Sequence, residues 1–247
     1  MNLVRAEFLK LRKRRGLVAA AALLTIAPIL IGYTVLSYLH ATNPADHGPA
    51  GGTDDLAGAL EALMKIGLVA AVIVGATAGA GDAGAGVFRE LVVTGRSRLQ
   101  LFAARIPGGL ALLLPLVALA FSIASVASIA LAGSDAAPGA ELLVRSGAWV
   151  AVGAVSAYLL GVGVASALGS RAMAIGLLLG WQLAAAPILL ATGKLDGMLP
   201  NAALQQLEPG DAGRPLSLSV TAALVVLVVW TLVPLAAGAW RTQSADA

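Results

Sequence analysis

Apolar residues occur in six long stretches along the chain. They cover about residues 16–39, 60–81, 107–132, 147–168, 172–192 and 217–240. Each stretch is long enough for an α-helix to cross a bilayer, which takes about 17 to 25 residues. None shows the alternation of apolar and polar residues that is typical of a strand in a membrane barrel. The pattern therefore predicts an all-α, polytopic membrane protein with six transmembrane helices.

The composition agrees with lipid as the main solvent of the chain. Of the 247 residues, 59% are hydrophobic and only 12% are charged, whereas soluble domains carry about 25% charged residues. The chain has no cysteine, which excludes disulfides, thiolate metal sites and thiol catalysis. The basic residues do not cluster on a soluble face, so we expect no nucleic-acid partner. We expect a single transmembrane domain over residues 1–247.

The charged residues are distributed unevenly between the segments that join the six stretches. If the N-terminus is cytoplasmic and every stretch crosses the bilayer, the cytoplasmic segments hold 12 of the 16 basic residues but only 4 of the 13 acidic ones. Lysine and arginine accumulate on the cytoplasmic side of membrane proteins. We therefore expect a multi-pass protein of the cytoplasmic membrane, with both termini in the cytoplasm.

The first 16 residues, MNLVRAEFLKLRKRRG, have the pattern of a helix that lies along the membrane surface. Val4, Phe8 and Leu11 share one helical face, and most of the basic residues lie away from it. The alternative is that the basic run only anchors the topology at anionic lipid, and the two roles are compatible. The candidate residues of this interfacial helix are Glu7, Phe8, Lys10 and Leu11.

The segment between the second and third stretches, residues 82–106, is rich in charge. Phe88, Leu91 and Val92 share one helical face, so the charged side chains between them point elsewhere. This spacing predicts a short helix near residues 84–94. A passive link between two spans needs only a handful of residues, so a structured segment favours a surface for a cytosolic partner. The alternative is a cytoplasmic loop whose arginines only set the topology.

A turn and a second helix are expected next in the same segment. Gly95 follows the apolar run, where a glycine commonly ends a helix. Ser97 and Gln100 have the spacing of a capping box. These signals predict a tight turn at the glycine and a helix that runs from Arg98 towards Pro107. The segment is then a helix–turn–helix elbow on the cytoplasmic side.

The apolar stretches contain no well-embedded ionisable side chain, since Lys65 and Asp82 lie near stretch ends. Proton-coupled transporters usually carry buried ionisable relays. The sequence has no catalytic constellation and no G-x-x-x-x-G-K-[ST] phosphate loop. We therefore expect no enzyme activity, no metal and no cofactor in this chain. Energy for any transport must then come from another protein.

A few polar or helix-perturbing residues within the stretches are candidates for a substrate path. Gln182 is the most polar of them, and it lies beside Trp181 and about one turn before Pro187. The alternative is that Gln182 only hydrogen-bonds to a neighbouring helix. The full set of candidates is Thr77, Tyr158, Trp181, Gln182 and Pro187.

Two small-xxx-small motifs also occur, GATAG at residues 75–79 and GLLLG at residues 176–180. Such motifs let two helices approach closely. We expect them to pack within the bundle, and a seam between two subunits is the alternative.

The layout of the chain resembles the permease subunit of an ABC-2-type ABC transporter. The resemblance lies in the leading LVRAEFLKLRKRRG, in six spans with both ends inside, and in GAGVFRELVVTGRSRLQLFAAR between the second and third spans. Glu7, Lys10 and Leu11 match the Glu-Leu-x-Lys-Leu-like start of that family. Ser97 and Arg98 match a Ser-Arg pair in its inner loop.

Further along the inner loop, Leu101 fits the family pattern, and Arg105 stands where a basic residue often follows. The chain departs from the family at Gly86 and Val87, where an acidic-aromatic EYRxGT pattern is common.

The resemblance implies an exporter in which two six-helix permease units, identical or homologous, pair with two cytosolic ATPase subunits. ATP and Mg would be bound by the ATPase, and the inner loop would couple ATPase closure to motion of the spans. The ATPase-coupling candidates are Phe88, Arg89, Glu90, Leu91, Thr94, Arg96, Ser97 and Arg98. The alternatives are a non-transporting scaffold or assembly subunit that recruits a cytosolic partner, and an ion-coupled secondary transporter.

Overall fold

The computed structural model describes residues 3–84, 97–192, 197–210 and 218–244, and these residues form helices joined by short connections. The helices are α1 (Leu3–Lys13), α2 (Arg15–Thr42), α3 (Thr53–Ala62), α4 (Leu68–Gly84), α6 (Arg98–Ala130), α7 (Ala140–Leu168), α8 (Arg171–Gly180), α9 (Ala186–Ala191), α10 (Pro200–Gln206) and α11 (Val220–Ser244). A π-helical turn, η1 (Leu63–Gly67), joins α3 to α4, and a second, η2 (Trp181–Ala185), joins α8 to α9. The all-α prediction is confirmed for the described residues.

Six of these helical segments are long and apolar enough to cross a membrane, and each overlaps one of the six predicted stretches. The segments are Arg15–Thr42, Thr53–Gly81, Arg98–Ala130, Ala140–Leu168, Arg171–Ala191 and Val220–Ser244. The prediction of six transmembrane helices is therefore confirmed by length and composition. The second segment includes α3 because η1 joins it to α4 without a break in the helix.

The third span is longer than the sequence predicts. The predicted helix from Arg98 exists, but it does not stop near Pro107 and instead continues through Pro107 and Pro115 as one helix, α6. Prolines are tolerated in membrane helices because neighbouring helices and polar groups satisfy the freed backbone. The predicted helix at residues 85–94 and the turn at Gly95 lie outside the described residues.

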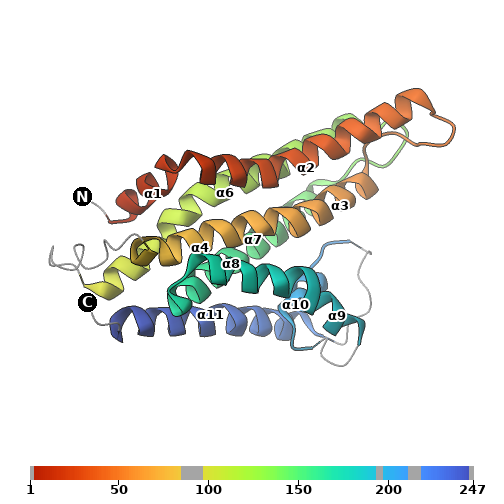
Figure 1. The fold of residues 1–247 in the computed structure, drawn as a ribbon. Helices are drawn as coiled ribbons and strands as arrows, with labels where there is room; N and C mark the ends of the chain where they lie inside the picture. Colours follow the sequence, from red (N-terminus) through yellow and green to blue (C-terminus); the bar gives the residue numbers. More distant parts are fainter. Residues whose placement is uncertain (1–2, 85–96, 193–196, 211–217, 245–247) are drawn as a thin grey trace.

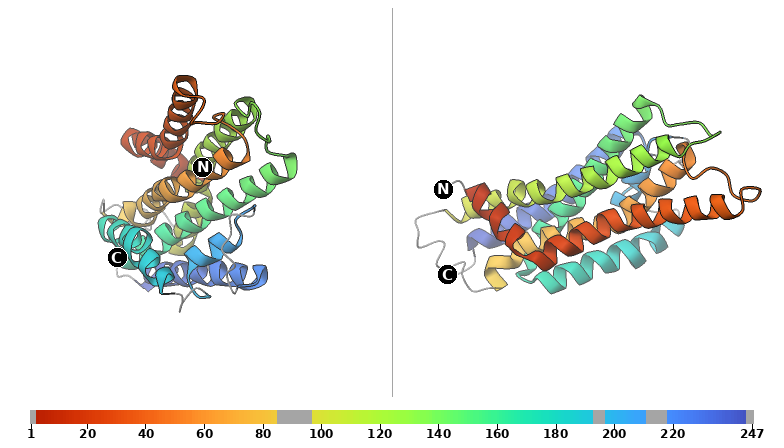
Figure 2. Two further views of the ribbon diagram at one scale, coloured as in Figure 1. Left: turned by 90° about the vertical axis from the view of Figure 1, so that its right-hand side faces the viewer. Right: turned by 90° about the horizontal axis from the view of Figure 1, so that it is seen from above.

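The six spans form an elongated bundle around α7. Figure 2 shows α2 and α11 on opposite sides, with α4 and α7 between them. In Figure 1, α1 and the last turns of α11 lie at one end of the bundle, which we call the terminal end. The other end carries α10 and the start of α3, and we call it the loop end. An even number of spans brings the first and last helices back to the same end.

Glycines allow α7 to lie directly against α4. A Cβ on Gly161 would lie 2.8 Å from the carbonyl oxygen of Val72 and 3.1 Å from the Cα of Gly75. A Cβ on Gly79 would similarly meet the backbone of α7. The predicted close approach at GATAG is thus confirmed. The GLLLG motif differs, because a Cβ on Gly176 or Gly180 would have no atom of another described helix within 4 Å.

The same kind of contact joins α7 to α11. A Cβ on Gly163 would lie 2.6 Å from the backbone nitrogen of Leu235, and one on Gly238 would lie 2.7 Å from the carbonyl oxygen of Gly163. Close backbone approach is the main source of helix association in lipid, where apolar side chains gain little by leaving the solvent.

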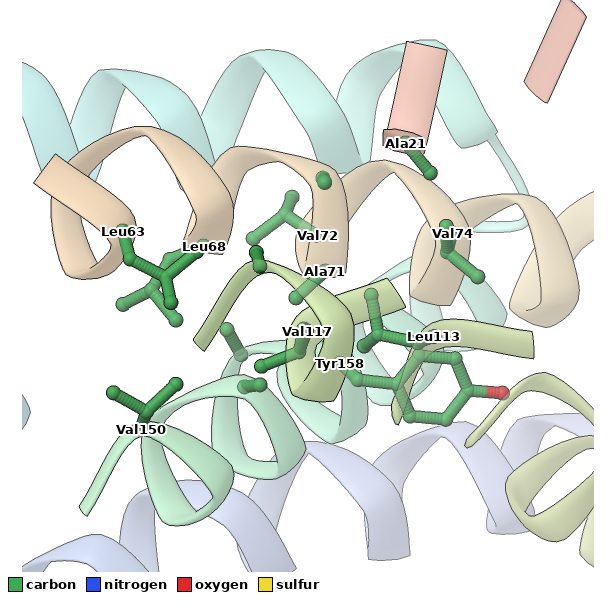
Figure 3. Packing of buried hydrophobic residues seen from close by; sticks show 14 of the residues in the cluster. Ala21, Leu63, Leu68, Ala71, Val72, Val74, Leu113, Val117, Val150 and Tyr158 are labelled. Carbon is green, nitrogen blue, oxygen red and sulfur yellow. The ribbon is translucent and has the colours of Figure 1, made fainter. Parts of the chain in front are cut away.

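The core of the bundle lies where α4, α6 and α7 meet. Tyr158, Leu113 and Val74 are fully buried there, and Figure 3 shows these side chains gathered between the three helices. The ring of Tyr158 lies over Gly109 of α6, where any larger residue would overlap it. Because the core is close-packed, these three helices form one rigid unit.

We predict that Gly161→Ala destabilises the bundle and that Gly176→Ala does not. Both changes gain up to about 1 kcal/mol of helix propensity. Only the first forces a methyl group against backbone atoms of α4, and overpacking costs about 1–3 kcal/mol. Thermal unfolding of both variants in lipid nanodiscs measures the difference, and equal midpoints would contradict the packing described for α7.

Candidate functional site

Helix α1 lies against the first turns of α6 at the terminal end. Glu7 and Leu11 are buried in this contact, and the backbone of α1 comes close enough that a Cβ on Gly108 would meet Glu7. The Nζ atom of Lys10 lies 2.5 Å from the carboxylate of Glu7. Most basic side chains of α1 are exposed, as the sequence predicts. The predicted helix is confirmed, and its place at a membrane surface stays a prediction.

Arg105 is buried, with 2% of its surface exposed, although the sequence places it in the cytoplasmic loop. Its Nη1 atom donates a hydrogen bond of 2.7 Å to the carbonyl oxygen of Gly79 in α4. Ser166 of α7 donates to the same oxygen at 3.0 Å, and the hydroxyl of Tyr158 donates to the carbonyl oxygen of Arg105 at 2.6 Å. The loop interpretation is wrong for Arg105, because α6 starts seven residues earlier and carries it between the helices.

Two further arginines tie the terminal end together. Arg98, in the first turn of α6, donates from Nη1 to the carbonyl oxygen of Gln243 in α11 at 3.1 Å. Arg241 of α11 donates to the carbonyl oxygen of Ala167, near the end of α7. Arginine can bridge helix ends in this way because its planar head carries several donors. The terminal end is therefore crosslinked from α4 through α6 and α7 to α11.

The predicted cap of α6 is present in the structure. The side chain of Ser97 accepts a hydrogen bond of 3.2 Å from the backbone nitrogen of Gln100. Ser97 and Arg98 are thus placed at the start of α6. The other coupling candidates lie outside the described residues; they are Phe88, Arg89, Glu90, Leu91, Thr94 and Arg96. Their role stays a prediction.

A cavity of about 510 Å³ opens at the loop end, between η1, α7, α9 and α10. Glu61, Lys65 and Glu208 bring charge to its wall, and Trp149 and Leu190 are among the apolar residues. A smaller hollow of about 50 Å³ adjoins it towards the middle of the bundle. The two share four lining residues, which are Leu68, Gln182, Asn201 and Leu204.

The short helix α10 separates the inner hollow from the loop end, and side chains of three spans hold it in place. Trp149 of α7 donates from Nε1 to the carbonyl oxygen of Leu204 at 2.7 Å. Trp230 of α11 donates to the carbonyl oxygen of Met198, just before α10, at 2.8 Å. A backbone carbonyl without a donor is costly once it is shielded from water, so these two indole donors stabilise the position of α10.

A third contact to α10 comes from η2, where the amide of Asn201 donates to Oε1 of Gln182 at 3.2 Å. The two π-helical turns, η1 and η2, both lie in the wall of the cavity, since Met64 belongs to one and Gln182 to the other. Single π-turns inside α-helices occur frequently at functional sites. The loop-end cavity is therefore a stronger candidate for ligand binding than the inner hollow.

The structure separates the five substrate-path candidates into two groups. Trp181 and Gln182 line the inner hollow, and Gln182 and Pro187 line the larger cavity. Thr77 and Tyr158 are buried nearer the terminal end. Thr77 bonds within its own helix to the carbonyl oxygen of Ile73. Neither Thr77 nor Tyr158 lines the cavity or the hollow, so the geometry does not bring the five together.

The sequence pattern did not single out three residues of the cavity. Glu61, Asn201 and Glu208 lie at stretch ends or in a predicted outer loop, and they come together only when α10 folds back against the spans. A short run of Pro-Asn-Ala-Ala-Leu-Gln-Gln after the fifth stretch was the available signal, because proline often begins a helix. Nothing in the local sequence predicts that Trp149 and Trp230 hydrogen-bond to this segment.

The carboxyl group of Glu208 lies in a partly buried position beside the cavity. Burial raises its pKa above the ordinary value, the negative charge of Glu61 raises it further, and the positive charge of Lys65 lowers it. Burial dominates because desolvation disfavours the charged form. The folded protein therefore binds a proton at Glu208 more readily than the unfolded chain does.

We predict that Arg105→Met lowers the stability of the bundle by about 2 kcal/mol, because a buried hydrogen bond from a charged donor is worth about 1.5–3 kcal/mol. Arg171→Met is the matched control, since Arg171 is exposed at the same end. Thermal unfolding in nanodiscs compares the two variants. A loss of stability in both, or in neither, would contradict the role of Arg105.

A second prediction concerns pH. Because the folded pKa of Glu208 is raised, its ionisation costs stability, and stability falls as pH rises from the unfolded pKa through the folded one. Glu208→Gln should therefore stabilise the protein at pH 7 and lose this advantage near pH 4. Unfolding midpoints at the two pH values measure it, with Glu141→Gln as the exposed control. A gain that does not depend on pH would contradict the assignment.

Comparison with protein families and with curated proteins does not identify a family for this chain. No protein-family model matches the chain, and no curated protein matches it. What the chain does must therefore be inferred from its residues and their contacts.

Proposed function

We propose that the chain is the membrane-spanning permease subunit of an ABC transporter of the ABC-2 type. It exports a substrate across the cytoplasmic membrane, using ATP hydrolysed by a separate ATPase subunit. A second permease unit, identical or homologous, completes the membrane part. ATP and Mg belong to the ATPase, since the chain has no phosphate-binding loop of its own.

The observation that carries this proposal is the crosslinking of the terminal end around the segment between α4 and α6. This segment is charged, and it is the proposed docking surface of the ATPase. It connects Gly84, the last residue of α4, to Ser97, which caps α6. The helix that follows the segment in the chain carries Arg98, which binds α11, and Arg105, which binds α4. A push on the segment is therefore passed to three spans at once.

Helix α1 supports the same function from the other side of α6. Its buried face packs on α6 at Gly108, while its basic residues remain exposed. Exposed lysine and arginine near a bilayer are attracted to anionic headgroups, by about 1 kcal/mol for each residue. The helix then fixes the start of α6 relative to the membrane surface, so that α6 turns against a stationary support.

A second candidate, ion-coupled transport, gains support from one observation. Glu7 and Arg105 are both buried at the terminal end, and buried ionisable groups are typical of transporters driven by proton gradients. The composition of the apolar stretches did not indicate them, because both lie outside the predicted stretches. Against this candidate, Glu7 is already paired with Lys10.

We predict that Phe88→Ala and Arg89→Ala weaken binding of the ATPase subunit by about tenfold or more, because truncation of a hot-spot residue at the centre of an interface costs about 2 kcal/mol or more. The chain is co-expressed with Walker-type ATPase subunits from the same genome, and any complex is quantified after purification. Arg145→Ala, at the loop end, is the matched control and should not alter binding.

Three outcomes separate the candidates. Binding that depends on the segment, together with ATP-dependent transport in vesicles, supports the permease. Binding without any ATP-dependent transport indicates a scaffold. Transport driven by an imposed proton or sodium gradient, with no ATPase bound, indicates an ion-coupled transporter and overturns the proposal.

A further inference from the structure

The wall of the loop-end cavity carries more negative than positive charge. Among its described lining residues, Glu61 and Glu208 are acidic and Lys65 is basic. Lys65 is already paired with Glu61, with 2.5 Å between Nζ and Oε1. Among the described lining residues, Glu208 therefore adds a second carboxylate without a second cation, and the raised pKa of Glu208 reflects burial and the nearby charge of Glu61. A ligand with one positive charge would balance the site.

The deeper part of the site is apolar and aromatic. The inner hollow lies between α4, α7 and α11, and it is lined by Trp181 and Trp230, whose ring centroids are 5.2 Å apart. Trp149 lines the outer cavity. Tryptophan faces attract both apolar groups and organic cations. A ligand that fits both parts has a charged head and an apolar or aromatic body.

One polar group of a residue that lines the hollow lacks a partner within the described structure. The Nε1 atom of Trp181 is buried and finds no hydrogen-bond acceptor among the described residues. A buried donor without an acceptor is costly, and buried donors in folded proteins nearly always have a partner. An acceptor atom on the body of a bound molecule would satisfy it. This observation is independent of the charge at the mouth.

The dimensions also suit a small molecule. The cavity of about 510 Å³ falls in the range of about 300–1,000 Å³ that is usual for ligand pockets. Its lining follows the usual design, with an apolar wall and a few polar groups that orient the ligand. Glu61, Lys65, Gln205 and Glu208 are polar groups of this wall, and they lie towards the loop end of the bundle.

We propose that this cavity binds an amphipathic organic cation, with its positive head between Glu61 and Glu208 and its apolar body directed towards Trp181 and Trp230. The binding site is a property of this chain alone. Only the identification of the ligand as a transported substrate rests on the proposed function. Binding is therefore tested without an ATPase, and a failure of either proposal leaves the other standing.

The test compares two probes of nearly the same shape and opposite charge, tetraphenylphosphonium and tetraphenylborate. The full-length chain is placed in phosphatidylcholine nanodiscs, and binding is measured by equilibrium dialysis after subtraction of the uptake by empty nanodiscs. We expect saturable binding of the phosphonium at one site per chain. The borate should bind at least about tenfold more weakly, because its charge repels the carboxylates.

Three variants locate the binding. Glu208→Gln and Gln205→Lys should each weaken binding of the phosphonium by about fivefold, the usual size of one partly screened ion pair. Gln205→Lys changes an exposed residue, so it tests the charge of the mouth without disturbing the core. Glu141→Gln is the control, because Glu141 also pairs with a basic residue four positions later but lies outside the cavity. It should leave binding unchanged.

Equal binding of the two probes would overturn the proposal and would identify the cavity as an apolar or lipid site. Selective binding of the phosphonium that neither Glu208→Gln nor Gln205→Lys weakens would also overturn it, because the cation would then sit elsewhere. A preference for the phosphonium that falls in both variants and persists in Glu141→Gln supports it.

Discussion

Close contact between backbones, made possible by glycine, holds this bundle together. Lipid is as apolar as the side chains it surrounds, so the helices gain little from hiding apolar surface and depend on packing and hydrogen bonds instead. Helix α7 provides that packing on two sides, through Gly161 against α4 and Gly163 against α11. Because α7 is fixed in this way, its Tyr158 and Ser166 can hold α6 and α4 by their backbone oxygens.

Local signals in the sequence predicted the features that depend on one helix or one turn. The six spans follow from the length of the apolar stretches, the start of α6 from the Ser97 cap, and the close packing of α4 within the bundle from GATAG. The burial of Arg105 and the position of α10 could not be predicted in this way. Each depends on where several distant helices meet, and a sequence pattern carries no signal for that.

The two ends of the bundle have different physical characters. At the terminal end, arginines of α6 and α11 bind backbone oxygens of neighbouring helices, which makes this end stiff. At the loop end, α10 covers a cavity and is held by side-chain hydrogen bonds and by the packing of Ala203 against α11. A stiff end transmits displacement well, and a cavity beside a short helix offers a place for a ligand. The proposed docking segment joins two helices of the stiff terminal end, and the proposed cation site lies at the loop end.

The two π-helical turns have a geometric consequence for the cavity wall. Each turn holds one residue more than an α-helical turn would, so it stores a surplus residue within a continuous helix. If the surplus in Trp181–Ala185 moved along the helix by one position, the residues it passed would rotate by about 100°. The indole of Trp181 would then turn away from Trp230 while the span kept its length and its ends. A wall built from such turns can change the side chains it presents without any helix leaving its place.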